Sequence, residues 1–248
     1  MPIDFDAIKR KLEKLQGNSR SQSTMWKPTE GEESTVRLLS FPDNDGQPFK
    51  ELMFYYNIPG QRGLLAPYQF GKKDPIQELI TKLRDDGTKE SYELAKKLYP
   101  KMRCYAAVIV RGEEDKGVQL WGFGKTVYQK LLGIMLDEDY GDITDAETGT
   151  DIVLTYNVPG TPGSFPKTTL KPRRRPSILC DEGVANCDEL LNSIPDFNTL
   201  FQRQTSEEIQ ALLDEFLSSD TSSEGGSSET EKYNTKSKVD AAFNKLMG

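Results

Sequence analysis

Two strand-length apolar runs joined by a short charged turn, over residues 101–123, constrain the fold of this chain more than any other feature. Side chains alternate between the two faces of a strand. In the first run, every second residue of the stretch 104–110 is small and apolar, whereas Tyr105 lies on the opposite face. In the second run, Trp121 and Phe123 share a face. The pattern predicts two central strands of a sheet.

The second face of this stretch carries large aromatic rings together with arginines, although a core needs only one apolar face. Unpaired nucleobases stack on such rings, at about 1–3 kcal/mol each, and arginine or lysine contacts the phosphates. Aromatic residues also favour strands for packing reasons. The stretch alone therefore leaves two interpretations open, a binding face or rings packed beneath a covering helix.

A complete absence of histidine narrows the classes of function. It excludes Ser-His-Asp and Cys-His nucleophilic pairs, His-ligated zinc, and histidine as a general base. The sequence also contains no Gly-rich phosphate loop, no GxSxG motif and no paired-carboxylate motif. We therefore expect no catalytic residues, and a protein that is not an enzyme.

Length and cysteine content bound the architecture and the compartment. The 248 residues are enough for one ordinary domain with appendages, or for two small domains. No apolar run is long enough to span a membrane, and charged residues follow the first methionine closely, unlike in a signal peptide. Three cysteines without tight spacing are typical of a reducing compartment rather than of a disulfide scaffold. We expect a cytoplasmic protein.

The net charge of −7 is unevenly distributed along the chain. Residues 1–180 contain 27 Lys and Arg against 25 Asp and Glu, a balance of +2, whereas residues 181–231 contain 13 acids and one arginine, a balance of −12. The last 17 residues return to +3. This segregation predicts a near-neutral body with a basic face, and an acidic tail that competes for that face.

Hydrophobic periodicity predicts a mainly β chain with helices, which is an α+β fold. The expected strands beyond the central pair cover residues 34–41, 49–56, 151–158 and 167–171, and the expected helices cover residues 76–86, 89–100, 124–136 and 204–217. Thr88 is the expected N-cap of the second helix, and Thr205 with Glu208 forms a capping box at the start of the fourth.

Two groups of cations are candidates for phosphate contact. A Gly/Pro-rich loop between a strand and a helix carries aromatic and basic side chains, namely Arg62, Tyr68, Phe70, Lys72 and Lys73. Farther along, Arg173, Arg174 and Arg175 lie between two prolines, next to a strand with Lys167 and Lys171. Both groups also fit an ordinary solvated surface.

Both ends of the chain have the pattern of appendages. Residues 1–20 form an expected helical arm with an apolar stripe and the basic residues Lys9, Arg10 and Lys11, and its stripe packs on its own body or on a neighbouring molecule. Residues 21–217 form the expected core. Residues 218–248 begin as a low-complexity acidic segment, expected to be disordered. Val239, Phe243 and Leu246 then share a short stripe, which is either a partner-docking motif or a frayed terminus.

This layout resembles the gene thirty-two, helix-destabilising single-stranded-DNA-binding proteins of T-even-like bacteriophages, over nearly the whole chain. The most specific match runs from Tyr105 through the turn to the LWGFGKTVYQKL segment at residues 120–131. The resemblance implies an oligonucleotide-binding (OB) β-barrel core that coats single strands cooperatively during phage DNA replication, recombination and repair in the host cytoplasm. It also implies a basic arm that contacts the neighbouring protomer, and an acidic tail that recruits replication proteins.

Two departures from the family matter. The family typically holds zinc with one histidine and three cysteines, including a Cys-Pro-x-Cys element, but the corresponding stretch here reads Ala66-Pro67 and then Asp74-Pro75-Ile76-Gln77. We expect no zinc or other cofactor, and a loop subdomain held by apolar packing around Leu64, Leu65, Ile76 and Leu79. The family's basic triplet is followed by Ser or Thr, whereas Leu12 follows the triplet here.

Residues and resemblance together predict the binding residues. The expected base-stacking rings are Tyr105, Trp121 and Phe123, joined by Tyr55, Tyr68 and Phe70. The expected contacts to the nucleic-acid backbone are Arg62, Lys72, Lys73, Arg103, Arg111, Lys125, Arg173, Arg174 and Arg175. The resulting interpretation is sequence-nonspecific binding of single-stranded DNA. The alternatives are a protein-interaction scaffold and an OB-fold protein that binds single-stranded RNA.

Overall fold

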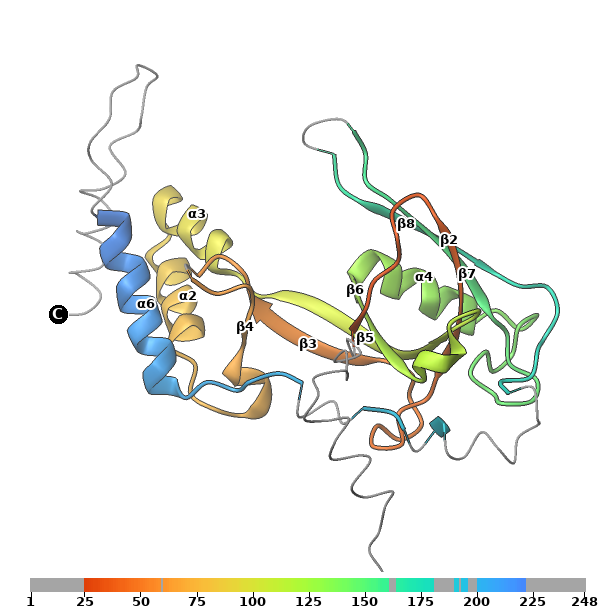
Figure 1. Cartoon of the computed structure of the whole chain (residues 1–248). Helices are drawn as coiled ribbons and strands as arrows, with labels where there is room; N and C mark the ends of the chain where they lie inside the picture. Colours follow the sequence, from red (N-terminus) through yellow and green to blue (C-terminus); the bar gives the residue numbers. More distant parts are fainter. Residues whose placement is uncertain are drawn as a thin grey trace, which may run out of the picture. The chain divides into compact units, whose positions relative to one another are not determined.

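A computed structural model describes residues 25–58, 60–160, 164–180, 190–191, 193–195 and 200–221 (Figure 1). Within these residues a large sheet is combined with helices, which confirms the predicted α+β class. The predicted arm with Lys9, Arg10 and Lys11, and the predicted docking stripe of Val239, Phe243 and Leu246, lie outside the described residues. No helix in the described part is long and apolar enough to cross a membrane.

The described chain forms two compact units. Unit 1 comprises the described residues up to Lys50 and those between Cys104 and residue 195, and unit 2 comprises residues 51–103 and the described residues from 200 onward. The two units are therefore built from interleaved segments of the chain.

Unit 1 is organised around strand β5 (Lys101–Val110), which lies between β6 (Gln119–Gly124) and β2 (Glu33–Leu39). The strand order is β1-β6-β5-β2-β7-β8, where β1 is Met25–Trp26, β7 is Ile152–Asn157 and β8 is Lys167–Pro172. β2 is antiparallel to both β5 and β7, with Val36 opposite Val110 on one side and opposite Ile152 on the other. β7 and β8 form an antiparallel hairpin (Figure 1). Closure of this sheet into a barrel of the OB type stays a prediction.

The predicted central strands exist, and β5 is buried on both faces from Cys104 to Val110. A short 3₁₀ turn, Glu114–Lys116, lies between β5 and β6. Helix α4 (Lys125–Met135) follows β6 directly and packs against β8. The two-residue strand β1 was not predicted, because a pair of residues carries no periodicity to detect.

Gly122 explains how the aromatic face of β5 and β6 closes. A Cβ atom at this position would lie 2.9 Å from Cε1 of Tyr105, which is closer than carbon atoms can pack. The absent side chain therefore makes room for the tyrosine ring over β6. Any larger residue at position 122 would force that ring to shift.

Unit 2 consists of β3 (Lys50–Tyr55), β4 (Leu64–Leu65), a 3₁₀ turn (Pro67–Phe70) and the helices α2 (Pro75–Asp86), α3 (Lys89–Leu98) and α6 (Ser206–Thr221). One apolar cluster joins these elements, and it contains Leu64, Ile76 and Leu79 as predicted for this subdomain. Leu65, the fourth predicted residue, is buried as well. Ile209 and Leu213 dock α6 on the cluster. The predicted apolar packing is confirmed.

Side chains at the helix starts satisfy the free N–H groups as predicted. The hydroxyl of Thr88 accepts a hydrogen bond from the Ser91 N–H at the start of α3. At α6, the Thr205 N–H donates to Glu208 at 2.8 Å and the Glu208 N–H donates back to Thr205 at 3.3 Å, which is the predicted capping box. α6 continues to Thr221, past the predicted core boundary at residue 217.

Candidate nucleic-acid interface

Most of the rings predicted to stack on bases belong to the core. Tyr105, Trp121 and Phe123 are only 6%, 2% and 4% exposed, and Tyr55 is fully buried in unit 2. The rings of Trp121 and Phe123 pack 4.6 Å apart, and Trp26 contacts Trp121 edge-on at 5.9 Å. These four rings thus pack in the core, as the packing alternative expects, and a stacking role for them stays an untested prediction. Strand periodicity separates two faces but does not reveal that both are covered.

Burial of both tryptophans of the chain, Trp26 and Trp121, leads to a first prediction. We expect iodide to quench the tryptophan emission of the free protein far less than that of a short tryptophan-containing peptide, because a charged quencher does not enter a packed core. Bound single-stranded DNA should change this quenching little. A Stern–Volmer titration with and without oligonucleotide measures it. Strong iodide quenching that DNA suppresses would return Trp121 to the binding face.

Arg37 is a buried charge on β2 of unit 1, and the residues directly before and after it in the sequence are apolar. Its Nε donates to Asp151 Oδ1 at 2.8 Å, and its remaining N–H groups donate to the carbonyls of Asp145, Gly149 and Ser177. Burial lowers the pKa of Arg37, and the Asp151 carboxylate opposes that shift. The guanidinium thus ties the loop before β7 and the segment after β8 to β2.

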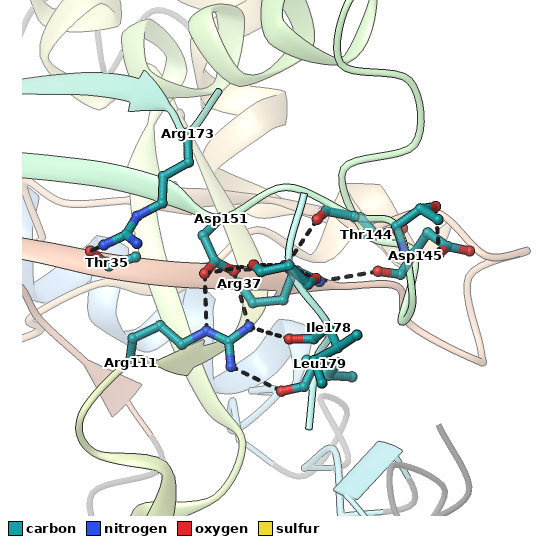
Figure 2. Close-up of polar contacts among 12 residues, drawn as sticks. Thr35, Arg37, Arg111, Thr144, Asp145, Asp151, Arg173, Ile178 and Leu179 are labelled. Carbon is teal, nitrogen blue, oxygen red and sulfur yellow. Dashed lines mark hydrogen bonds and ion pairs between the residues drawn. The ribbon is translucent and has the colours of Figure 1, made fainter. Parts of the chain in front are cut away.

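Arg111 completes this cluster of buried and half-buried charges. Figure 2 shows the Asp151 carboxylate between the guanidinium groups of Arg37 and Arg111. Arg111 donates to both oxygens of Asp151, at 3.1 and 3.2 Å, and to the carbonyls of Ile178 and Leu179, both at 2.9 Å. Arg111 therefore has a structural role, and its contact to the nucleic-acid backbone stays a prediction. The predictive signal was absent, because Asp151 is 40 residues away in the sequence.

The cluster positions the predicted arginine triplet at the surface. The Arg173 N–H donates to the Asp151 carbonyl at 2.9 Å, and its guanidinium lies 3.4 Å from the Thr35 hydroxyl (Figure 2). Arg174 and Arg175 follow and are exposed, as are Lys167 and Lys171 on the preceding strand β8. The structure thus brings the predicted cations of this region together along one edge strand and the segment that follows it.

An exposed ring that sequence reasoning missed lies in the same region. Phe165, in the connection between β7 and β8, is 87% exposed and stands two residues before Lys167. We call Phe165, Lys167, Lys171, Arg174 and Arg175 the hairpin surface. A fully solvated phenylalanine next to cations combines a stacking ring with phosphate ligands. The sequence indicated it only as an aromatic residue that lies between two predicted strands and belongs to neither.

Unit 2 presents a second group, which we call the loop surface: Tyr68, Phe70, Lys72 and Lys73. Both rings are half-buried and both lysines are exposed. The Arg203 guanidinium lies over the Phe70 ring, 4.1 Å from its centre. Burial first, and then Asp74 and Tyr99, raise the pKa of Tyr68, so Tyr99 is close to this surface. The four predicted residues are therefore brought together on one short segment.

Helix α3 adds an aromatic and basic stripe that the sequence analysis had treated only as helix. Lys89, Tyr92 and Lys96 recur at spacings of three and four, which places them on one helical face, and Tyr99 is the C-cap residue that follows the last helical residue. The two rings are 59% and 51% exposed, and both lysines are exposed. We call these four residues the α3 stripe. The spacing of the residues on the solvent-facing side of the helix, and not only on its apolar side, would have indicated this stripe.

The remaining predicted cations are scattered. Arg62 and Lys125 are exposed, in the loop after β3 and at the start of α4. Arg103 is half-buried near Tyr56, whose pKa is raised by burial and lowered to a smaller extent by that guanidinium. As contacts to the nucleic-acid backbone, these three residues stay predictions.

Cys180 is disulfide-bonded, which the sequence analysis did not expect.

Comparison with known proteins identifies the family of this chain. A family model described as gp32 DNA binding protein like matches residues 30–218, which is most of the chain and includes all three surfaces. A search of curated proteins finds no match. The match confirms the resemblance that the sequence analysis drew from the segment around LWGFGKTVYQKL. The chain belongs to the gp32-like family of single-stranded-DNA-binding proteins.

Proposed function

We propose that this protein coats single-stranded DNA without sequence preference, and that it binds through the hairpin surface of unit 1 and the loop surface and α3 stripe of unit 2. The observation that carries the proposal is the exposure of aromatic rings between cations, with Phe165 87% exposed beside Lys167, on a chain of this family. An enzymatic role is not part of the proposal.

Stacking and charge together account for the preference for single strands. Each base has a π-face, so rings such as Phe165 and Tyr92 accept any sequence. The exposed lysines and arginines contact phosphates and release counterions. In a duplex the bases are already stacked on each other, so the rings gain nothing from binding it. Binding then draws transiently melted DNA toward the single-stranded state by mass action.

The ends of the chain supply the cooperative and regulatory parts of the proposal. The basic triplet Lys9, Arg10 and Lys11 contacts the neighbouring protomer along the strand. The acidic block competes weakly for the basic surfaces, and the stripe of Val239, Phe243 and Leu246 docks replication and recombination proteins of the phage. Charge segregation along the sequence and the family membership support this arrangement. The setting would be the cytoplasm of the infected bacterium, and the core an OB-type barrel.

Titration with a labelled oligonucleotide at several salt concentrations tests the function. We expect tight binding of single strands at low salt, weak binding of duplex, and a slope of log affinity against log salt of about −0.7 per contacted phosphate. The double variant Arg174→Gln/Arg175→Gln should make the slope less steep by up to about 1.4. Equal affinity for single strands and duplex, or a salt-independent affinity, would contradict the proposal. A matched RNA strand shows whether the sugar matters.

A further inference from the structure

The segment 66–77, where the family carries zinc ligands, does not fit a zinc ion in this protein. Structural zinc requires four ligands, almost always thiolates and imidazoles. The chain has no histidine, and the positions of the Cys-Pro-x-Cys element are Asp74, Pro75, Ile76 and Gln77. In the described part of the chain, no group of three or more His, Cys, Asp or Glu side chains lies close enough to hold a metal. A different device must hold this segment.

Asp74 is that device, because its carboxylate joins three elements of unit 2. Its Oδ1 accepts hydrogen bonds from the N–H groups of Ile76 and Gln77, each at 3.1 Å, and so caps α2. Its Oδ2 accepts from the Tyr55 hydroxyl on β3 at 2.9 Å and from the Tyr68 N–H at 3.4 Å. The side chain is only 4% exposed. A buried carboxylate persists only with such a set of donors.

The Tyr55–Asp74 bond is itself protected from water. Tyr55 is 1% exposed, and burial followed by the Asp74 charge raises the pKa of its hydroxyl, which therefore stays a donor. The bond links the end of β3 to the start of α2 across 19 residues of sequence.

Further contacts fix the residues between these points. The Gln69 side chain accepts from the Met53 N–H at 3.0 Å and donates to the Met53 carbonyl at 3.0 Å, so it pairs with β3 like a strand residue. The Ser206 hydroxyl donates to the Lys73 carbonyl at 2.7 Å. The segment that carries Phe70, Lys72 and Lys73 is thus fastened on both sides of the exposed lysines.

We propose that Asp74 replaces the metal centre of this family, organising the 66–77 segment without zinc and positioning Lys72 and Lys73 for contact with nucleic acid. The part about the lysines rests on the proposed function, whereas the part about the metal does not. Asp74 touches no ligand itself, so it is a positioning residue that acts through the loop surface.

The metal part is tested by thermal unfolding of the full chain. We expect the same melting temperature in EDTA, in buffer, and in buffer with a slight excess of Zn²⁺, and no stoichiometric zinc in the purified protein. A chelator-induced fall in melting temperature, or one zinc per chain by metal analysis, would overturn the proposal. This readout needs no DNA.

The positioning part is tested with Asp74→Asn, which keeps an acceptor for the helix cap but places an amide group opposite the Tyr55 hydroxyl and the Tyr68 N–H. We expect the variant to bind single-stranded DNA more weakly, with a salt slope less steep by up to about 1.4, like Lys72→Gln/Lys73→Gln. In that double-lysine background, Asp74→Asn should cause no further change. Asp85→Asn, an exposed site on α2 with the same loss of charge, is the matched control.

The outcomes separate the two ideas. If Asp74→Asn weakens binding equally with and without the two lysines, or not at all, positioning is refuted. If the double-lysine variant binds like the natural protein, the loop surface is not part of the interface and the proposed function fails there, while the chelator result still stands. Tyr55→Phe removes only the buried hydroxyl and keeps the ring, so it gives the same test should Asp74→Asn unfold. It should reproduce the smaller salt slope, and an unchanged slope in this variant would refute positioning through the Tyr55–Asp74 bond.

Discussion

Replacing Arg37 with methionine should lower the free energy of unfolding by about 3–5 kcal/mol, which is the usual result of removing one partner from a buried ion pair. Methionine fills much of the arginine volume but donates no hydrogen bond. The carbonyls of Asp145, Gly149 and Ser177 each lose the guanidinium donor, and the first two keep one backbone N–H donor each. Among the residues that the structure describes, Asp151 then keeps Arg111 as its one ion-pair partner. Urea denaturation followed by tryptophan emission measures the loss, because both tryptophans lie in unit 1.

Two variants show whether the position or the charge is responsible. Arg174→Met makes the same replacement at an exposed site and should change stability by less than about 0.5 kcal/mol. Arg37→Lys keeps the charge but cannot reach four acceptors in a planar fork, so it should fall between the natural protein and Arg37→Met. An unchanged urea midpoint in Arg37→Met would mean that the cluster is replaceable by apolar packing, as some buried ion pairs are.

Stability at Arg37 bears on binding because the same cluster holds the base of the hairpin surface. Arg37 donates to Ser177, and Arg173 donates its N–H to Asp151, so the arginine triplet is anchored at both ends. We therefore expect partial unfolding of this cluster to weaken DNA binding as well as stability. The buried guanidinium of Arg37 thus helps to hold the exposed arginines of the hairpin surface in place.

Local periodicity was sufficient to predict the longer strands and the α-helices of this fold. The strands at β2, β3, β5, β6, β7 and β8 and the helices α2, α3, α4 and α6 all lie within a few residues of the predicted ranges. Each is long enough for its apolar spacing to be read, and Thr88 and Thr205 mark helix starts with side chains that act within three residues. These are short-range effects, which a sequence records directly.

Which face of an element is covered depends on long-range pairing, which local periodicity does not record. The side chains of Tyr105 and Trp121 follow the alternation expected of strands. Their burial comes from contacts with Gly122 and Trp26, which the alternation does not reveal. From the sequence, Arg111 is indistinguishable from a solvated cation, because its partner Asp151 is 40 residues away, just before β7. Conversely, Phe165 and the α3 stripe are exposed because nothing in the described chain covers them, and an isolated ring in a loop carries no periodic signal.

Phe165→Ala should weaken the binding of single-stranded DNA by about 1–3 kcal/mol, which is roughly 5–150-fold in affinity, if a base stacks on this ring. The ring is 87% exposed, so its removal leaves no cavity and should not alter the urea midpoint. Phe165→Tyr keeps an aromatic face and should bind nearly as well as the natural protein. Phe165→Leu keeps apolar area without a π-face and should resemble Phe165→Ala. Fluorescence anisotropy with a labelled oligonucleotide distinguishes the four proteins.

Leu136→Ala is the matched control, because it removes another large apolar side chain that is 83% exposed in unit 1. Leu136 is followed by Asp137, Glu138 and Asp139, whereas Phe165 precedes Lys167. Phosphates are repelled by the first environment and attracted by the second, so exposure alone does not make a binding residue. A loss of affinity in Phe165→Ala but not in Leu136→Ala would place the DNA strand along the β7–β8 hairpin. Equal affinity of both alanine variants and the natural protein would leave unit 2 as the place where bases stack.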